Sequence, residues 1–342
     1  MLKTRKLFIV LSVFLFGLVS KEVTAQDPSF SQFYSNPLYL NPAFAGAGDE
    51  CGRMVLNYRN QWPEINKGFV TYSISYDQSL DAIKSGYGIS VMADNAGQGS
   101  LNKTFVNGLY SYMVDLDYNW KLRLGLQATY IQRKLDWNKL IFSDQVDPIT
   151  GETRPYTNEI QPENLSKNVF DFSAGGVLYY SDQLSLGVSV YHIGAPDVSF
   201  YSTSKEESSR LNRKYTVHGT FNVNLTVGRL GDIQEGDFIL YPSFLYQQQG
   251  DYKQLNIGTY LSHDFITLGS WFRYTFEQKA EAVIFSVGIQ YNGMRFGYSY
   301  DYTLSNLGAT SGGAHEISFA ADFCLFTDPS RRTIHSIKSP KF

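Results

Sequence analysis

Apolar and polar residues alternate along most of this chain. In WKLRLGLQATY, residues 120–130, every second residue from Trp120 to Tyr130 is apolar, and the residues between them are polar or glycine. A period of two predicts a β-strand with one apolar and one polar face. The apolar face has an aromatic residue at each end, as expected of a lipid-facing strand between two aromatic girdles. The stretches 283–291 and 294–303 repeat this pattern.

Segments of this kind predict an all-β fold, a closed antiparallel transmembrane β-barrel of about 14 strands. The first, third and following odd links between them include the longest, 134–167 and 194–212, whereas the even links are short, such as Asn292-Gly293. Outer-membrane barrels alternate short periplasmic turns with longer outer loops in this way. The eighth link, VGRLGDIQEGD, is an exception because it is long for a turn. The strands are expected near 51–62, 68–78, 85–94, 102–114, 117–133, 168–181, 184–193, 213–226, 237–247, 253–262, 265–277, 281–291, 294–303 and 314–326.

A soluble all-β protein, such as a propeller or a tandem sandwich, is the competing interpretation. Soluble strands also alternate and also need turns. However, a soluble fold buries its apolar face, and a buried face does not require an aromatic residue at each end of the strand. The girdle pattern therefore favours the membrane barrel.

The two ends of the chain predict export and a periplasmic location for both termini. Residues 1–25 carry basic residues, a short apolar run and a small residue at position 25, which predicts a signal peptide. Residues 26–50 form an N-terminal aromatic and proline-rich segment, expected in the periplasm or at the barrel mouth. The barrel is expected to span 51–326, and 327–342 form a basic tail, which is either disordered or docked on a periplasmic partner.

Barrel closure predicts how the first and last strands pair, because lipid cannot satisfy an open strand edge. With Cys51 aligned opposite Cys324, the same register places two opposite-charge pairs on the lumen side. The alignment predicts a disulfide that locks this seam, since an exported chain is oxidised. The alternative is two unrelated thiols. The predicted cross-strand charge pairs are Arg53 with Asp322 and Arg59 with Glu316.

Composition argues against several functions. The net charge is −3 and the basic residues are scattered, which excludes a nucleic-acid surface. None of the five histidines has a companion at metal-ligand spacing, so no cofactor, metal or enzymatic activity is expected. His192 shares the face of apolar residues near a strand end and is expected at the lipid interface. Asp144, Asp147 and Glu152 lie in an acidic outer loop that does not match a calcium-binding spacing.

The basic residues of the predicted lumen allow two interpretations. They either line an open pore or pair with Asp301, Glu277 and their neighbours to close one. The residues concerned are Lys121, Arg123, Arg273 and Arg295.

The segment SQFYSNPLYLNPAFAG, residues 31–46, is irregular. Its two Asn-Pro pairs prevent a helix or a central strand, because proline lacks an N–H and restricts the residue before it. Its aromatic residues are costly to leave in water. They are expected to pack either on the barrel's own rim or on a partner.

This segment and the following NYRNQW strongly resemble the N-terminal signature of the PorP/SprF family of Bacteroidetes outer-membrane proteins. Tyr58, Arg59, Gln61 and Trp62 match the end of that signature. LDWNKLIFSDQVDP and GAHEISFAADF are further features in common, so the resemblance covers the mature chain. The matching positions at its start are Asp27, Pro28, Phe30, Ser31, Gln32, Asn36, Pro37, Asn41, Pro42, Ala43 and Gly46.

The resemblance implies an accessory or anchoring role in type IX protein secretion and, in some members, in gliding motility. It implies periplasmic lipoprotein partners, including a peptidoglycan-binding component, and export or surface attachment of a large secreted adhesin through its C-terminal domain. The other partner is outer-membrane lipid. A passive pore for small solutes is the alternative function. The residues expected to contact the secretion machinery are Asp27, Pro28, Phe30, Gln32, Phe33, Tyr34, Asn36, Pro37, Asn41, Pro42 and Phe44.

Overall fold

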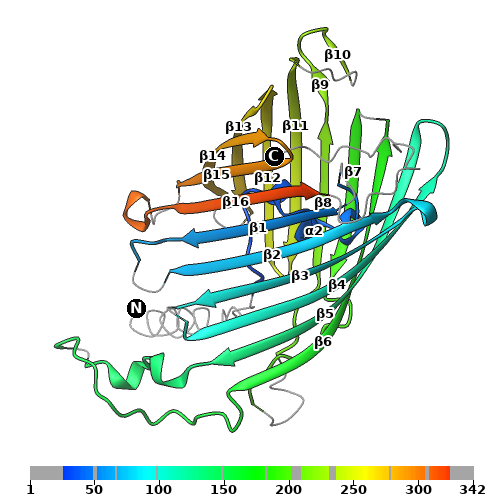
Figure 1. Ribbon diagram of the computed structural model, residues 1–342. Helices are drawn as coiled ribbons and strands as arrows, with labels where there is room; N and C mark the ends of the chain where they lie inside the picture. Colours follow the sequence, from blue (N-terminus) through cyan, green and yellow to red (C-terminus); the bar gives the residue numbers. More distant parts are fainter. Residues whose placement is uncertain are drawn as a thin grey trace, which may run out of the picture.

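The computed structural model is dominated by long antiparallel strands arranged as a curved wall (Figure 1). Most strands begin and end within a few residues of the alternating stretches of the sequence. The structure describes residues 26–48, 52–65, 68–97, 99–147, 149–181, 183–201, 209–230, 236–276, 279–304 and 308–323. The strands are β1 Gly52–Gln61, β2 Phe69–Leu80, β3 Ser85–Ala96, β4 Leu101–Asp115, β5 Trp120–Leu135, β6 Ser166–Tyr180, β7 Leu184–Tyr191, β8 Lys214–Phe221, β9 Val223–Asn224, β10 Arg229–Leu230, β11 Phe238–Gln249, β12 Tyr252–His263, β13 Ile266–Thr275, β14 Lys279–Tyr291, β15 Met294–Thr303 and β16 Ala314–Phe323.

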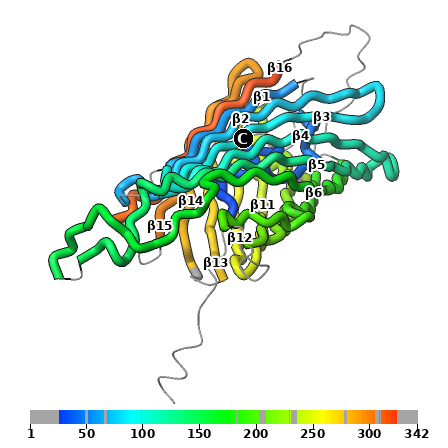
Figure 2. Tube along the Cα trace, turned by 90° about the horizontal axis from the view of Figure 1, so that it is seen from below, coloured from blue at the N-terminus to red at the C-terminus, as the bar shows by residue number. Residues whose placement is uncertain are grey.

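Fourteen of these strands close into a barrel within the described part of the chain. Each pairs with its sequence neighbour, β16 pairs with β1, and β8 pairs with β11 to complete the ring. In Figure 2, β1 to β6 form one side of the barrel and β11 to β13 lie on the opposite side. The predicted barrel is confirmed, including its strand number.

The helices are short and form no part of the barrel wall. Among the described residues, no helix is long and apolar enough to cross a membrane. The helical turns are η1 Phe33–Ser35, α2 Pro37–Leu40, η2 Pro42–Phe44, η3 Asp81–Ile83, η4 Trp137–Lys139, η5 Ser143–Gln145 and η6 Ala309–Ser311.

The two faces of the wall differ as the alternation predicts. Leu126 and Phe296 on the outer face are 64% and 56% exposed. Gln127 and Asp301, on the same two strands, face the lumen and are 8% and 3% exposed. The outer surface is therefore apolar over the strands, as a lipid-facing surface must be.

The two ends of the barrel differ in the length of their links. The end at which β1 begins, here called the short-turn rim, carries links such as 181–183, 264–265 and 292–293. The opposite end, here called the long-loop rim, carries the links 136–165 and 192–213. The eighth link, which was the exception in the sequence, contains two short strands. β9 pairs with β11 next to β8, and β10 folds back and pairs with β9.

The seam between β1 and β16 has the register predicted from the sequence. Arg53 lies opposite Asp322 and Arg59 opposite Glu316, and the register runs as far as Gly52 opposite Phe323. Cys51 and Cys324 lie outside the described residues, so the disulfide stays a prediction.

The N-terminal segment, residues 26–48, does not pack on one rim. Asp27 contacts Gln249, the last residue of β11 at the long-loop rim. Gly46 contacts Asp77, near the short-turn rim. The segment therefore crosses the lumen from one end to the other. This corrects the expectation that it stays at the rim from which β1 starts, because the lumen buries more of its apolar surface than a rim does.

Candidate functional site

The lumen, filled by the N-terminal segment, is the candidate functional site. Every residue from Phe30 to Ala47 is buried except Tyr39, which is half-buried. The Asn-Pro pairs keep the segment out of the sheet, and the chain folds into three single turns, η1, α2 and η2. Figure 1 labels α2 inside the barrel. Pro37 and Pro42 each stand at the start of a turn, where the missing N–H costs nothing.

An ion cluster holds the end of the segment near the long-loop rim. The Asp27 carboxylate lies 2.8 Å from Nε2 of His192 and 3.3 Å from Nζ of Lys214. Nδ1 of His192 lies 2.7 Å from the Asp171 carboxylate. The backbone N–H of Asp27 donates to Oε1 of Gln249 at 2.9 Å. The four ionic side chains are at most 8% exposed, so their charges depend on one another.

The cluster changes the ionisation of two groups that lie outside the strands. Burial alone raises the pKa of the Asp27 carboxyl, but the charges of His192 and Lys214 outweigh it and hold the pKa well below its usual range. Burial alone lowers the pKa of His192, but the Asp27 charge and hydrogen bonds to Asp171 and Asp27 raise it to about 9. At neutral pH the anchor is an ion pair.

This anchor predicts an alkaline transition at the segment's outer end. Protonated His192 contributes fully below its unfolded pKa, about 6.5, and the contribution is lost as pH rises through about 9. The Asp27 contribution is present above about pH 4 and lost as pH falls through the lowered folded pKa. A spin label at Ser29→Cys, with Cys51 and Cys324 changed to serine, should gain mobility above about pH 9.

The matched control for the alkaline transition is Asp27→Asn, in which His192 loses its main anionic partner on the segment. The alkaline step should then disappear and the label should be mobile at neutral pH. A spectrum of the Ser29 label that stays immobile up to about pH 10.5 would contradict the anchor.

A second buried network holds residues 31 and 32. The backbone N–H groups of Ser31 and Gln32 donate to the Glu316 carboxylate at 2.7 and 3.2 Å. The Ser31 hydroxyl donates to Asp301 at 2.6 Å. Arg59 bridges Asp301 and Glu316 at 3.1 and 3.2 Å. The segment thus supplies the donors that these buried carboxylates need.

Of the four predicted lumen cations, Arg123, Arg273 and Arg295 are paired or hold the segment. Arg273 lies 2.9 Å from Asp301, and both side chains are 4% exposed. Arg123 donates to the carbonyl of Ala45 in the segment at 2.8 Å. This arrangement matches the closed alternative of the sequence analysis. Glu277, expected to take part, lies outside the described residues.

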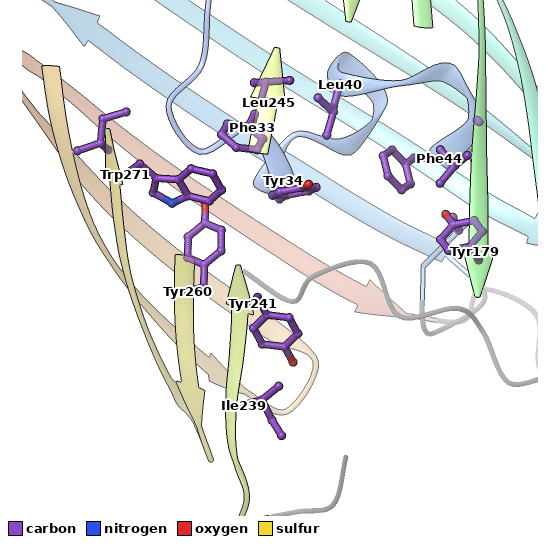
Figure 3. Packing of buried hydrophobic residues seen from close by; sticks show 14 residues of the cluster. Phe33, Tyr34, Leu40, Phe44, Tyr179, Ile239, Tyr241, Leu245, Tyr260 and Trp271 are labelled. Atoms are coloured by element: carbon purple, nitrogen blue, oxygen red, sulfur yellow. The ribbon is translucent and has the colours of Figure 1, made fainter. Parts of the chain in front are cut away.

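The aromatic residues of the segment pack against the wall (Figure 3). Phe33 meets Trp271 edge to face, with ring centroids 4.7 Å apart. The Tyr34 hydroxyl donates to the carbonyl of Gly219 at 3.1 Å, and Phe44 is 1% exposed. Each fully buried aromatic side chain contributes on the order of 2 kcal/mol of hydrophobic stabilisation.

A row of small residues crosses five strands of the wall beneath residues 41–46. A Cβ atom on Gly125 would overlap the backbone of Pro42 and Ala43, and one on Gly86 would overlap that of Ala45. The wall therefore leaves room for the segment's backbone at this level. The row consists of directly paired positions on β3 to β7, Gly86, Ser111, Gly125, Gly175 and Ser189.

Asn41 joins the segment to this part of the wall. Its Nδ2 donates to the carbonyls of Val188 at 3.0 Å and Gly176 at 3.3 Å. Its Oδ1 accepts from the N–H of Ala43 at 3.0 Å and so caps η2. The motif residue thus fixes both the turn and its place on the wall.

Gly125→Val tests whether the small-residue row seats the segment. Valine suits a strand but has no room beneath Ala43, so residues 41–46 should be displaced at a cost of about 1–3 kcal/mol. Hydrogen exchange of the peptides covering residues 38–48 should accelerate. Gly108→Val on β4 is the matched control, because a Cβ there meets nothing within 4 Å. Equal exchange in both variants would contradict the seat.

The segment reaches the short-turn rim beside the seam. The N–H of Gly46 donates to Asp77 at 2.8 Å, and Gly46 has φ 66°, which favours glycine. Arg53 pairs with Asp77 at 2.9 Å and donates to the carbonyl of Phe44 at 3.3 Å. The start of β1 and the end of the segment are therefore held together at this rim.

The ion pairs at the seam differ from those predicted in one case. Arg59 does pair with Glu316 across it. Arg53, however, pairs with Asp77 on β2, and Asp322 pairs with Arg295 on β15 at 2.7 Å. Opposite positions in the register do not by themselves fix which neighbour a long side chain reaches.

The remaining predicted contact residues also lie against the barrel or the segment itself. Gln32 donates to the carbonyl of Glu316 at 3.0 Å, and Asn36 donates to Ser73 at 3.3 Å. Phe30 is 2% exposed and packs with Met92 and Phe105 in a second cluster. The carbonyl of Pro28 accepts a hydrogen bond from Tyr39. In this arrangement a partner reaches the buried residues Phe30, Gln32 and Asn36 only if the segment leaves the lumen.

His192 shows what the sequence pattern missed. By alternation it belongs on the lipid face, but its side chain is 6% exposed and binds Asp27 and Asp171. Its backbone is left-handed, φ 58°, which interrupts the alternation after β7. The expectation of an interfacial ring is wrong for this reason. Its position directly after a strand end was the only signal.

The acidic outer loop uses its carboxylates internally. Asp144 accepts hydrogen bonds from Thr157 and Asn158, and Asp147 accepts from Ile149 and Thr150. In the described residues, no group of three or more His, Cys, Asp or Glu side chains is arranged to hold a metal ion. These bonds hold the carboxylates of Asp144 and Asp147 within the loop.

The fold and the filled lumen together define a plugged outer-membrane β-barrel. Within that class, the chain belongs to the PorP/SprF family, the type IX secretion system membrane proteins, whose family model matches residues 22–321. None of the curated proteins matches this chain. The family assignment agrees with the resemblance at the N-terminus.

The solved structures that this chain matches include outer-membrane proteins. The toluene transporter TbuX of Ralstonia pickettii is 12% identical, with a TM-score of 0.49 over 84% of this chain and 93% of that chain. Omp33 of Acinetobacter baumannii is 8% identical, with a TM-score of 0.43 over 80% of this chain and 98% of that chain. These values are too low to transfer a substrate or a partner.

Proposed function

We propose that this chain is a sealed accessory and anchoring component of type IX protein secretion. It links periplasmic lipoprotein machinery, including a peptidoglycan-binding component, to the export or surface attachment of a large secreted adhesin. In gliding cells the same link serves motility. The observation that carries the proposal is the lumen, which the chain's own segment occupies through contacts at both rims.

The packing of the lumen supports a scaffold over a passive pore. An open pore needs a continuous polar path, whereas here Arg59, Arg273 and Arg123 are bound to carboxylates or to the segment. A barrel of this size that is filled along its length suits a protein whose partners bind its rims and loops. The short-turn rim is the side assigned to the periplasm, since outer-membrane barrels carry their short turns there.

A pull-down tests this function directly. The tagged protein is recovered from mildly cross-linked, detergent-solubilised outer membranes, and its partners are identified by mass spectrometry. Recovery of a peptidoglycan-binding lipoprotein together with a large secreted surface protein supports the proposal. Recovery of the barrel alone contradicts it.

Planar-bilayer conductance separates the two functions. The wild-type protein should give a sealed baseline if it is a scaffold. Stable, ion-selective openings of the wild-type barrel would instead favour the pore for small solutes.

A further inference from the structure

A cavity of about 270 Å³ opens at the long-loop rim, above the outer end of the N-terminal segment. Its size lies just below the ~300–1,000 Å³ of pockets for drug-sized ligands, so it suits a small molecule or a single ring. Its floor is built by segment residues 26–29. The strands supply aromatic side chains, Trp62, Phe69 and Tyr252, and polar ones, including Arg59, Thr275 and Glu281.

Trp62 is held at this cavity by an unusual backbone. Its φ is 59°, a left-handed conformation that is rare for a bulky residue. Gln61 faces the lumen, so an extended residue 62 would face the lipid, and the left-handed backbone breaks that alternation. The Trp62 N–H donates to the carbonyl of Gly313 at 2.7 Å, and the indole meets Phe69 edge to face at 5.7 Å. Strain of this kind concentrates at functional positions.

Three polar atoms of the lining residues, each exposing less than 1 Å², have no hydrogen-bond partner among the described residues. They are Nε of Arg59, Oγ1 of Thr275 and Oε2 of Glu281. Arg59 and Thr275 are each 2% exposed. Together the three atoms offer a donor, a hydroxyl and a carboxylate acceptor. Buried polar groups of this kind call for a partner that both donates and accepts.

The charged side chains of the lining carry both signs, Arg59 and Lys103 against Asp94 and Glu281, which argues against an ionic ligand. Asp27 is paired with His192, and Lys103 donates to the carbonyl of Gln26 at 3.0 Å. Asp94 accepts from the Thr71 hydroxyl at 2.8 Å. A phosphate or carboxylate would meet the Glu281 oxygen, and an ammonium group would meet Nε–H of Arg59. A neutral ligand with several hydroxyls avoids both conflicts.

We propose that this mouth cavity, defined by Trp62, Phe69, Tyr252, Thr275 and Glu281, binds one neutral sugar ring of a surface carbohydrate. On binding, small side-chain rotations uncover the three atoms, so that the hydroxyls of the ring donate to Glu281 and Thr275 and accept from Arg59. Its C–H face lies on the negative faces of the aromatic rings. The site goes beyond the secretion role and does not depend on it.

The floor of the cavity couples sugar binding to the seating of the segment. Residues 26–29 form part of the site only while Asp27 is anchored to His192. A ligand that binds only the seated form shifts the population toward it. The sugar therefore stabilises the plug, and loss of the anchor weakens the sugar site.

Saturation-transfer NMR with neutral methyl glycosides of glucose, galactose and mannose tests the site. The full-length protein is kept in lauryldimethylamine oxide, a detergent without sugar. Saturation should reach the ring C–H protons of at least one glycoside, and Trp62→Ala should weaken binding by at least about fivefold, as expected for a lost aromatic face. Trp137→Ala, in the distant loop turn η4, is the matched control and should bind as the wild type does.

A second variant keeps the test independent of any damage by Trp62→Ala. Thr275→Val conserves shape and removes one of the three polar partners, so it should also weaken binding while the barrel stays folded. No transfer to any glycoside at about 10 mM, ten times a millimolar Kd, would overturn the proposal. Binding of acetate or of a short peptide in preference to every glycoside would overturn it as well.

Discussion

Deletion of residues 27–45 should turn a sealed barrel into a conducting one. The deletion removes the part of the segment that contacts the wall from Asp27 at one rim to Ala45 near the other. A barrel of eight strands is filled by its own side chains, and one of 16–18 strands encloses an aqueous channel. Fourteen strands without the segment should leave a water-filled path. Planar-bilayer recording should show stable openings that the intact protein lacks.

The control for this deletion removes residues 154–162 from the outer loop, which is exposed along most of its length. That variant should stay sealed, because the wall rather than this loop supplies the contacts that seat the segment. If the variant that lacks residues 27–45 folds and remains sealed, the wall itself closes the lumen.

The variant that lacks residues 27–45 also tests the secretion contacts. A loss of partners in pull-down would show that the segment binds them, and an unchanged set would restrict its role to sealing.

Glu316→Ala should destabilise the folded barrel more than Gly125→Val does. Glu316 is fully buried and accepts hydrogen bonds from Ser31, Gln32 and Arg59. Its removal leaves Arg59 with one carboxylate fewer and two segment N–H groups without an acceptor. Breaking a buried ion pair from one side costs about 3–5 kcal/mol. Urea unfolding of the barrel in lipid vesicles should show a loss of this size.

Glu159→Ala in the exposed outer loop is the matched control for Glu316→Ala, and it should change the free energy of unfolding by less than about 0.5 kcal/mol. A Glu316→Ala variant within about 1 kcal/mol of the wild type would mean that the network tolerates an open position. The segment would then be held mainly by its aromatic residues and by the small-residue row.

The alternation of the chain was sufficient to predict the strands and their number, and the alignment of two cysteines predicted the seam register. A membrane strand has to present apolar residues to lipid and polar residues to the lumen, so its pattern is local and repeats every two residues. Closure required the first and last strands to pair, and placing Cys51 opposite Cys324 put Arg59 opposite Glu316, as in the structure. Only the particular partner of Arg53 differed, since Asp77 on the next strand lies equally within reach.

The sequence by itself thus determined the barrel and identified the N-terminal segment as irregular, apolar and in need of burial. Only the tertiary structure decided where that burial takes place. The contacts that seat the segment join positions far apart in the chain, such as Asp27 with His192 and Ala43 with Gly125. No local pattern encodes such pairs, because closing the wall creates the lumen and brings them together. At His192 and Trp62, left-handed backbones also broke the alternation on which the prediction relied.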